Sequence, residues 1–157
     1  PFLGLCLGHQ LLAEALGSKC GPAKKPEIGV MNVELTEDGK SGILFDGFSE
    51  EFKCLQWHGA EVKGLPEGSK CLASSKDCQI QAMSWGTRAY SLQFHIEVER
   101  STVNDWNSIE TYSNALEKAM GSNGPEILNK ACEKEMPKFN QMAERLYINW
   151  LQTSAHA

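Results

Sequence analysis

A cysteine between two glycines stands near the start of the chain and offers a nucleophile. The segment Gly4-Leu5-Cys6-Leu7-Gly8 has the spacing of a nucleophile elbow, with a thiol in place of the usual hydroxyl. In such a turn, glycines on both sides let neighbouring backbone come close. The helix that follows points its positive end at Cys6, which favours the reactive thiolate. The N–H of Leu7 would then face the oxygen of an attacked carbonyl. On this motif alone, a buried cysteine at a tight turn is almost as good an interpretation.

A thiol nucleophile needs a base, and a histidine later in the chain can supply it. His95 ends an apolar strand candidate, and Glu97 follows two residues later. Side chains two apart in an extended chain point the same way. Glu97 can therefore orient one imidazole nitrogen while the other faces Cys6. Taken alone, the segment would be interpreted as a structural histidine beside a solvated glutamate, but together with the elbow it predicts a catalytic triad.

The elements that must hold this triad follow from the spacing of apolar residues. A strand at 2–5 leads through the elbow into a helix at 7–16, and 18–27 is expected to be a loop. A strand at 30–36 is followed by a turn at 37–40. Further strands are predicted at 43–45, 53–57, 70–74, 79–84 and 89–95.

The chain turns helical after residue 99. One helix is predicted around 106–120, with Gly121 as its cap, and a second is expected to open at Gly124-Pro125. Pro137 is expected to interrupt that second helix. An amphipathic helix then follows from 139 to 151. Alternation of strands and helices without a linker predicts one α/β domain.

The composition and charge of the chain exclude several classes of function. The 157 residues carry a net charge of -5 and no basic run longer than Lys24-Lys25, which argues against a nucleic-acid surface. No apolar stretch reaches the roughly 20 residues of a membrane span, and no secretory leader is present, so we expect a cytoplasmic protein. The six cysteines form no C-x-x-C pair and no histidine stands beside them at zinc spacing. We therefore expect no metal and no cofactor.

With these motifs in place, the chain resembles the class I glutamine amidotransferases, of the type related to the glutaminase domain of GMP synthetase. The matching segments are GLCLGHQ at 4–10, QWHGAEV at 56–62, LPEG at 65–68 and QFHIEVE at 93–99. The resemblance implies a flavodoxin-like α/β fold with a mixed, mostly parallel central sheet flanked by helices and a helical C-terminal tail. It implies a single, partial domain over 1–157, of which 101–157 is a helical extension.

The resemblance also implies roles for the triad. Cys6 would attack the side-chain amide of glutamine, forming a glutamyl thioester and releasing ammonia. His95 would act as the base and then as the acid for the leaving ammonia, and Glu97 would orient it. Leu7 would bind the substrate oxygen through its backbone N–H.

Further positions are expected to bind the substrate. Gln10 resembles a residue that holds glutamine; a residue of the helix surface is the alternative, but four positions after Cys6 it lies one helical turn along, on the pocket side. Trp57, His58 and Gly59 resemble the segment whose backbone grips the amino-acid end, and core packing is an even alternative for Trp57. We assign no catalytic role to His9, despite its closeness to the thiol.

Two departures from the family pattern stand out. The family usually has proline between the histidine and the glutamate, where this chain has Ile96. Isoleucine favours extended backbone, so we expect the geometry to survive. The chain also starts at Pro1 and runs at once into an apolar strand. We therefore expect the natural protein to continue upstream, where the family's glycine-rich loop supplies a second oxyanion N–H.

Three functions remain open at this point. The first is a glutaminase that passes ammonia to a synthetase partner. The second is a thiol hydrolase of the γ-glutamyl peptidase type, and the third is an inactive scaffold. Glutamine or a γ-glutamyl compound is the expected ligand, with no nucleic acid or membrane. The first strand and helix should leave apolar surface uncovered, which predicts self-association of the chain.

Overall fold

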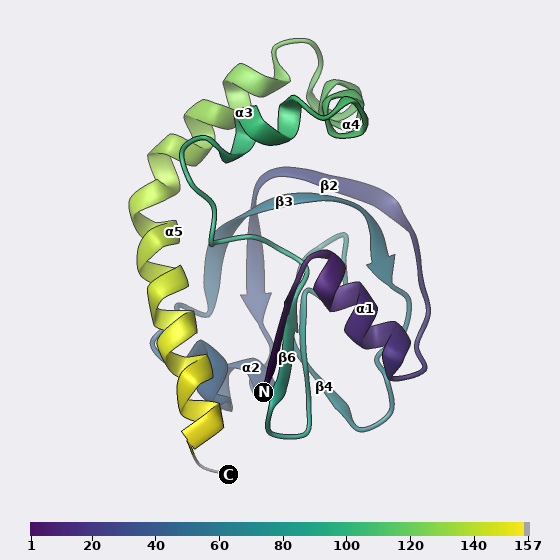
Figure 1. Cartoon of the computed structure of the whole chain (residues 1–157), viewed down its shortest axis with the longest axis vertical. Coiled ribbons are helices and arrows are strands. Elements are labelled where there is room, and N and C mark those ends of the chain that lie inside the picture. Colours follow the sequence, from purple (N-terminus) through teal and green to yellow (C-terminus); the bar gives the residue numbers. More distant parts are fainter. Residues whose placement is uncertain (156–157) are drawn as a thin grey trace.

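The first apolar run of the chain forms a strand at one edge of a six-stranded sheet, and helices pack on either side (Figure 1). The computed structural model describes residues 1–155. In chain order the elements are β1 (Phe2–Leu5), α1 (Leu7–Ala15), β2 (Cys20–Leu35), α2 (Glu37–Ser41), the 3-10 helix η1 (Ile43–Phe45), β3 (Glu51–Val62), β4 (Ser69–Ser74), β5 (Ala82–Trp85), β6 (Ala89–Leu92), α3 (Thr102–Asn107), α4 (Glu110–Met120) and α5 (Gly124–Ala155).

The sheet is mixed, as expected, with the strand order β1-β6-β5-β4-β2-β3. Parallel pairing is less common than the sequence suggested. Only β1 and β6 pair in parallel among the described strands, while the β2–β3, β2–β4, β4–β5 and β5–β6 pairs are antiparallel. Short connections explain this, because a loop such as residues 86–88 between β5 and β6 can join only antiparallel neighbours.

The prediction of a loop at 18–27 is wrong for residues 20–27, which belong to the long strand β2. The loop was predicted because this segment contains two prolines, which are typical of irregular structure. The pairing of β2 with β3 shifts register between Pro22 and Glu27, and a proline is tolerated in a strand at such an irregularity. The two long strands arch together across the molecule (Figure 1). This arch brings the distal part of β3, with Trp57, His58 and Gly59, toward α1.

Three further local predictions differ from the structure. Residues 43–45 form the 3-10 helix η1 rather than a strand, and residues 37–41 form the short helix α2 rather than a simple turn. The strand expected at 89–95 ends at Leu92. His95 lies beyond it and pairs instead with Leu55 of β3, through reciprocal backbone hydrogen bonds of 2.9 Å. Its position is thus set by β3 and not by β6.

The helical extension is confirmed as α-helical but is divided differently. A break at Ser108-Ile109 separates α3 from α4, and α4 ends at Gly121, whose φ is 76°. The expected interruption at Pro137 is wrong, because α5 continues through it. A proline removes one helical hydrogen bond. The buried residues Phe139 and Leu146 hold the helix against the core on the far side of it.

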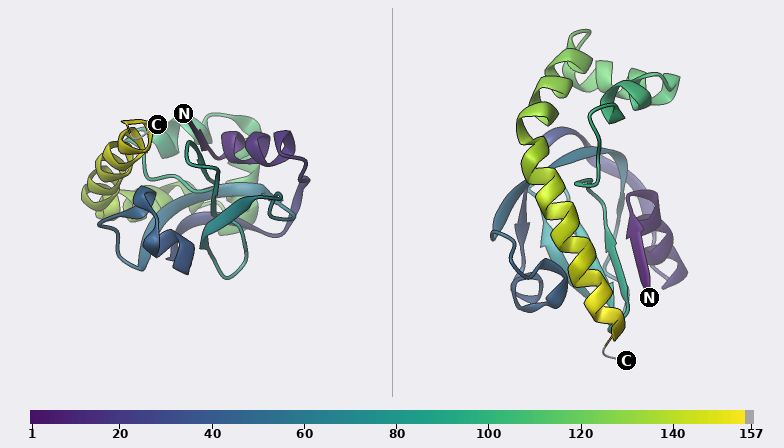
Figure 2. Two further views of the ribbon diagram at one scale, coloured as in Figure 1. Left: turned by 90° about the horizontal axis from the view of Figure 1, so that it is seen from below. Right: turned by 60° about the vertical axis from the view of Figure 1, so that its left-hand side comes forward.

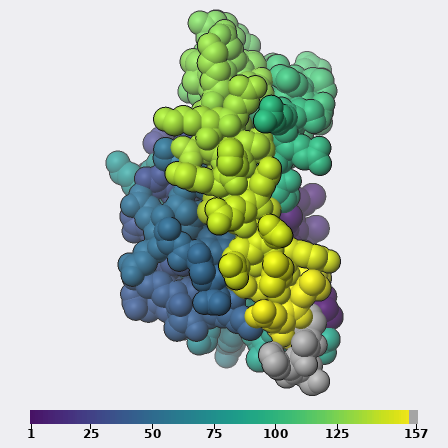
Figure 3. Space-filling view, turned by 90° about the vertical axis from the view of Figure 1, so that its left-hand side faces the viewer, coloured from purple at the N-terminus to yellow at the C-terminus, as the bar shows by residue number. Residues whose placement is uncertain are grey.

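Helix α5 runs the length of one side of the molecule, while α1 lies on the other side (Figure 1). Figure 2 shows that α5 ends near the start of β1, and the Trp150 Nε1 donates to the Phe2 carbonyl at 3.3 Å. On the opposite flank of α5, Asn149 donates to the carbonyls of Leu44 and Asp46 at 3.0 and 2.9 Å. The space-filling view of this face shows α5 lying against the segment that carries these carbonyls (Figure 3). No helix within residues 1–155 is long and apolar enough to cross a membrane.

The two glycines of the elbow have different structural roles. A Cβ on Gly4 would lie 2.6 Å from the carbonyl carbon and oxygen of Gly8, a distance that real side chains do not adopt. This confirms the close backbone approach predicted for Gly4. A Cβ on Gly8 would meet nothing within 4 Å. Space therefore demands glycine at position 4 and not at position 8.

This asymmetry predicts the effects of two matched substitutions. Gly4→Ala should lower the free energy of unfolding by about 1–3 kcal/mol, since β1 and α1 must move apart. Gly8→Ala should change it by less than about 0.5 kcal/mol, because the added methyl group meets open space. Urea unfolding followed by circular dichroism measures both. Equal destabilisation by the two variants would contradict this account of the turn.

Candidate active site

Cys6 occupies the sharp turn between β1 and α1. Its φ of 48° and ψ of -99° are unusual for a residue with a side chain, and Cys6 alone among the non-glycine residues described has a positive φ. Such strain persists only where the surroundings impose it, and it is typical of nucleophile elbows. The Cys6 N–H donates to the Leu92 carbonyl at 2.8 Å, which ties the turn to the end of β6. The half-buried thiol therefore stands at the N-terminus of α1.

His95 and Glu97 form the contact that their spacing predicted. The His95 Nδ1 lies 2.5 Å from the Glu97 Oε1, and the imidazole also forms a hydrogen bond with the Cys6 side chain. The structure thus brings the three predicted triad residues together. The other Glu97 oxygen accepts from the backbone N–H of Ile96 at 3.0 Å. A proline at position 96 has no such donor, so isoleucine gives the orienting carboxylate an additional hydrogen bond.

The charges of the pair support one another. Burial of His95 acts to lower its pKa, but hydrogen bonds with Cys6 and Glu97 and the charge of Glu97 outweigh it and raise the pKa to about 9. Burial acts to raise the pKa of Glu97, but the hydrogen bond and positive charge of His95 bring it below its ordinary value. The arrangement therefore favours a protonated imidazole beside an ionised carboxylate.

The residues predicted to bind substrate lie around the end of β3. The Gln10 Nε2 donates to the Ala60 carbonyl at 3.2 Å, so the side chain joins α1 to β3 instead of extending freely from the helix. Gly59 is exposed, which leaves its backbone accessible. Trp57 is buried, with its ring against Trp106 at a centroid distance of 5.4 Å. Its side chain thus has a packing role.

The side chain of His58 is also buried and faces a carboxylate in the core. Its Nε2 lies 3.1 Å from the Glu27 Oε2, and its Nδ1 lies 2.9 Å from the Ala60 carbonyl oxygen. With Cys78 these groups form a cluster whose potential ligand atoms lie within 4.8 Å of one another. The Glu27 oxygens already accept from Ser75 Oγ and Gln81 Nε2, each at 2.7 Å. This carboxylate is thus satisfied by protein donors, and the cluster is a structural hydrogen-bond network.

Two residues of the site were not predicted. The Gln93 Nε2 lies 3.6 Å from the Cys6 Sγ, and the Trp106 ring packs edge-on against His95 at a centroid distance of 4.8 Å. Gln93 could have been predicted from the sequence, because the residue two positions before His95 in extended backbone faces the same side as the histidine. Trp106 had no such signal, since it reaches the site only through the packing of the helical extension.

His9 is buried and has both ring nitrogens engaged. Its Nδ1 lies 2.8 Å from the Ser91 Oγ and its Nε2 lies 3.1 Å from the Ile80 carbonyl oxygen. Burial lowers the pKa of His9 to about 4. A neutral imidazole that donates to a carbonyl and accepts from a hydroxyl fixes α1 to the sheet. This agrees with its lack of a catalytic role in the sequence interpretation.

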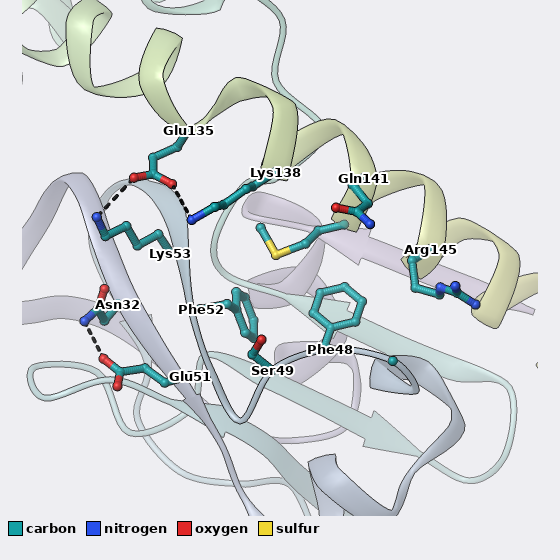
Figure 4. Close-up of a pocket in the computed structure, with 12 residues that line it drawn as sticks. Asn32, Phe48, Ser49, Glu51, Phe52, Lys53, Glu135, Lys138, Gln141 and Arg145 are labelled. Carbon is teal, nitrogen blue, oxygen red and sulfur yellow. Dashed lines mark hydrogen bonds and ion pairs between the residues drawn. The ribbon is translucent and has the colours of Figure 1, made fainter.

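A surface cavity of about 550 Å³ lies away from this site, between α5 and the start of β3 (Figure 4). None of the predicted site residues lines it. Its charged groups largely pair with one another, because the Glu135 carboxylate lies 3.1 Å from the Lys53 Nζ and 3.6 Å from the Lys138 Nζ. The cavity is therefore separate from the predicted site around Cys6.

Comparison with known proteins agrees with this geometry. Residues 1–110 match the family model of the class-I glutamine amidotransferases, and the chain belongs to that family. The glutamine-hydrolyzing GMP synthase subunit of Methanocaldococcus jannaschii is 42% identical over 99 residues, covering 62% of this chain and 51% of that protein. Its counterpart in Archaeoglobus fulgidus is 37% identical over 118 residues, covering 74% and 61%. The chain thus spans between half and two thirds of the length of these relatives.

Solved structures give the same result for the fold. A glutamine amidotransferase from Thermotoga maritima superposes with a TM-score of 0.80 at 34% identity, covering 94% of this chain and 60% of that one. A glutamine amidotransferase from Methylobacillus flagellatus gives a TM-score of 0.79 at 26% identity, covering 98% and 63%. The α/β fold with helices flanking a mixed sheet is therefore the family fold.

The His95 pair predicts a specific pH response. Because its pKa is raised from 6.5 to about 9, the pair stabilises the fold fully below pH 6.5, and this stabilisation is lost as pH rises through 9. Glu97→Gln should lower the midpoint of the His95 imidazole titration, measured by NMR, by roughly one pH unit or more. It should also flatten the fall in stability above pH 6.5.

Glu99→Gln is the matched control for this substitution. It removes the same charge two residues further along, where the carboxylate is exposed and has no contact with His95. Its titration should resemble that of the unmodified chain. An unchanged His95 midpoint in Glu97→Gln would show that the carboxylate does not hold the imidazole.

Proposed function

We propose that this chain is the glutaminase part of an amidotransferase, hydrolysing the side-chain amide of glutamine to glutamate and ammonia. The observation that carries the proposal is the junction of Cys6, His95 and Glu97, with 2.5 Å between the His95 Nδ1 and the Glu97 Oε1. A thiol at a strained turn, a base in contact with it and a carboxylate behind the base are the parts of a thiol hydrolase. The glutamine-hydrolyzing names of the relatives support glutamine as the substrate.

The first half of the reaction forms a thioester. His95, protonated in the resting site, already holds the proton that the Cys6 thiol gives up, and the Cys6 sulfur attacks the amide carbon as the thiolate. The oxygen of the tetrahedral intermediate takes the negative charge and lies against the N–H of Leu7, which has no partner within the first turn of α1. His95 then gives its proton to the amide nitrogen, the carbon–nitrogen bond breaks and ammonia leaves. Glu97 keeps the imidazole oriented throughout.

The second half releases glutamate. A water molecule attacks the thioester carbon while His95 takes one of its protons. The carbon–sulfur bond breaks, and the proton on His95 returns to the sulfur. The exposed backbone of Gly59 and the side chain of Gln10 offer polar groups for the amino-acid end of the substrate.

The ammonia is expected to pass to a synthetase. The relatives named as GMP synthase subunits support a partner that accepts ammonia, and in Syntrophomonas wolfei a glutamine-hydrolyzing GMP synthase matches this chain over only 28% of its own length. A cytoplasmic location belongs to the same proposal. It is supported by the six cysteines, which are all free in the structure and fit a reducing compartment.

Ammonia release from glutamine tests the proposal. The chain should release ammonia at a rate that Cys6→Ala lowers at least about a hundredfold, because the covalent route is lost. A coupled glutamate dehydrogenase assay measures this at high protein concentration. Cys71→Ala is the matched control, since this thiol lies on β4, and its rate should equal that of the unmodified chain.

Equal ammonia release by the chain and by Cys6→Ala would refute the proposal. A γ-glutamyl peptide serves as the competing substrate, and the amino acid or peptide that its cleavage releases is measured by chromatography. Faster cleavage of this peptide than of glutamine would instead assign the site to γ-glutamyl peptide hydrolysis.

A further inference from the structure

We propose that Gln93 is a catalytic residue of this site, donating a hydrogen bond from its side-chain amide to the sulfur of Cys6, and that Gln10, held by the Ala60 carbonyl, sets the direction of that bond. The inference rests on the proposed role of Cys6 as the nucleophile. It adds a donor that acts on the sulfur itself, separate from His95. The Gln93 side chain is fully buried, and its Nε2 lies 3.6 Å from the Cys6 Sγ.

A continuous hydrogen-bond chain connects Gln93 to the core. The Gln93 Oε1 accepts from the Gln10 Nε2 at 3.0 Å, and the same nitrogen of Gln10 donates to the Ala60 carbonyl at 3.2 Å. The Ala60 carbonyl also faces the His58 Nδ1 at 2.9 Å, and the His58 Nε2 faces the Glu27 carboxylate at 3.1 Å. Four groups thus link a buried carboxylate to the reactive sulfur.

The direction of the bonds nearest to Cys6 follows from the Ala60 carbonyl. The Ala60 carbonyl can only accept, which forces Gln10 to present its NH₂ group and not its oxygen. The second hydrogen of that NH₂ group then requires the oxygen of Gln93. The amide of Gln93 is thereby left with its NH₂ group toward Cys6.

A donor in this position favours the charged sulfur. A hydrogen bond to an ionised acceptor is stronger than one to a neutral acceptor, so the Gln93 N–H stabilises the thiolate relative to the thiol. If the amide were reversed, its oxygen would face the sulfur and have the opposite effect. Gln10 therefore acts as a positioning residue, because it holds the amide of Gln93 in the productive orientation.

Alkylation of Cys6 measures this effect without requiring glutamine turnover. The thiolate sulfur attacks the carbon of iodoacetamide and iodide leaves, so the rate at each pH follows the thiolate fraction. Peptide mapping by mass spectrometry isolates Cys6 from the other five thiols. Gln93→Glu keeps the acceptor for Gln10 but replaces the donor with a carboxylate. Gln93→Met keeps the volume and removes the donor without adding charge.

Both variants should move the midpoint of the alkylation profile to higher pH, by roughly one unit or more for Gln93→Glu and by less for Gln93→Met. Gln141→Glu is the control for added charge, because Gln141 is exposed on α5, and its profile should match that of the unmodified chain. Circular dichroism of each variant verifies the fold. An unchanged midpoint in a folded Gln93 variant would overturn the inference.

A second test uses the unmodified chain, so its result does not depend on whether any variant folds. The side-chain amide protons of Gln93 should shift in NMR spectra with the same midpoint as Cys6 alkylation, and the absence of such a shift would also overturn the inference.

The variant His95→Ala distinguishes a failure of this inference from a failure of the proposed function. If it leaves the alkylation profile unchanged, the triad itself fails. If it alters the profile while the Gln93 variants do not, only the role of Gln93 fails.

Discussion

The turn at Cys6 is the constraint on which the site depends. Its backbone has a φ of 48°, and the adjoining β1 and α1 approach so closely that Gly4 has no room for a Cβ. The same turn exposes the thiol at the N-terminus of a helix, where negative charge is favoured. Strain of this kind must be held by its surroundings. The bond from the Cys6 N–H to the Leu92 carbonyl and the buried contacts of His9 with Ser91 and Ile80 hold it here.

The proposed base, His95, is brought to this turn by other elements. His95 lies beyond the end of β6 and is fixed by its backbone pairing with Leu55, so the long β2–β3 arch determines where the imidazole lies. Trp106 of the helical extension then packs against the ring. The extension is thus connected to the site through one aromatic contact. The two halves of the triad meet because the parallel β1–β6 pair and the antiparallel arch converge at Leu92 to His95.

The residue pattern predicted which site residues lie together better than it predicted the strands and helices that carry them. Cys6, His95 and Glu97 come together as their spacing indicated, because local geometry alone places Cys6 in its elbow and Glu97 beside His95. The extent of β2 was missed, since Pro22 and Pro26 suppress a strand prediction and their tolerance depends on a register shift against β3. The helix interruption predicted at Pro137 was wrong for a similar reason, because packing along the whole of α5 outweighs the one hydrogen bond that proline removes. Trp106 could not be predicted, as only tertiary packing brings it to His95.

The central claim is that Cys6 is an activated nucleophile that recognises glutamine. Covalent labelling with a diazo-ketone analogue of glutamine tests it most directly, because the analogue alkylates a nucleophile that binds it as a substrate. Peptide mapping after incubation should find one adduct on Cys6, none on the other five cysteines, and protection by excess glutamine. Failure of Cys6 to react, or labelling spread evenly over the six thiols without protection by glutamine, would contradict the account.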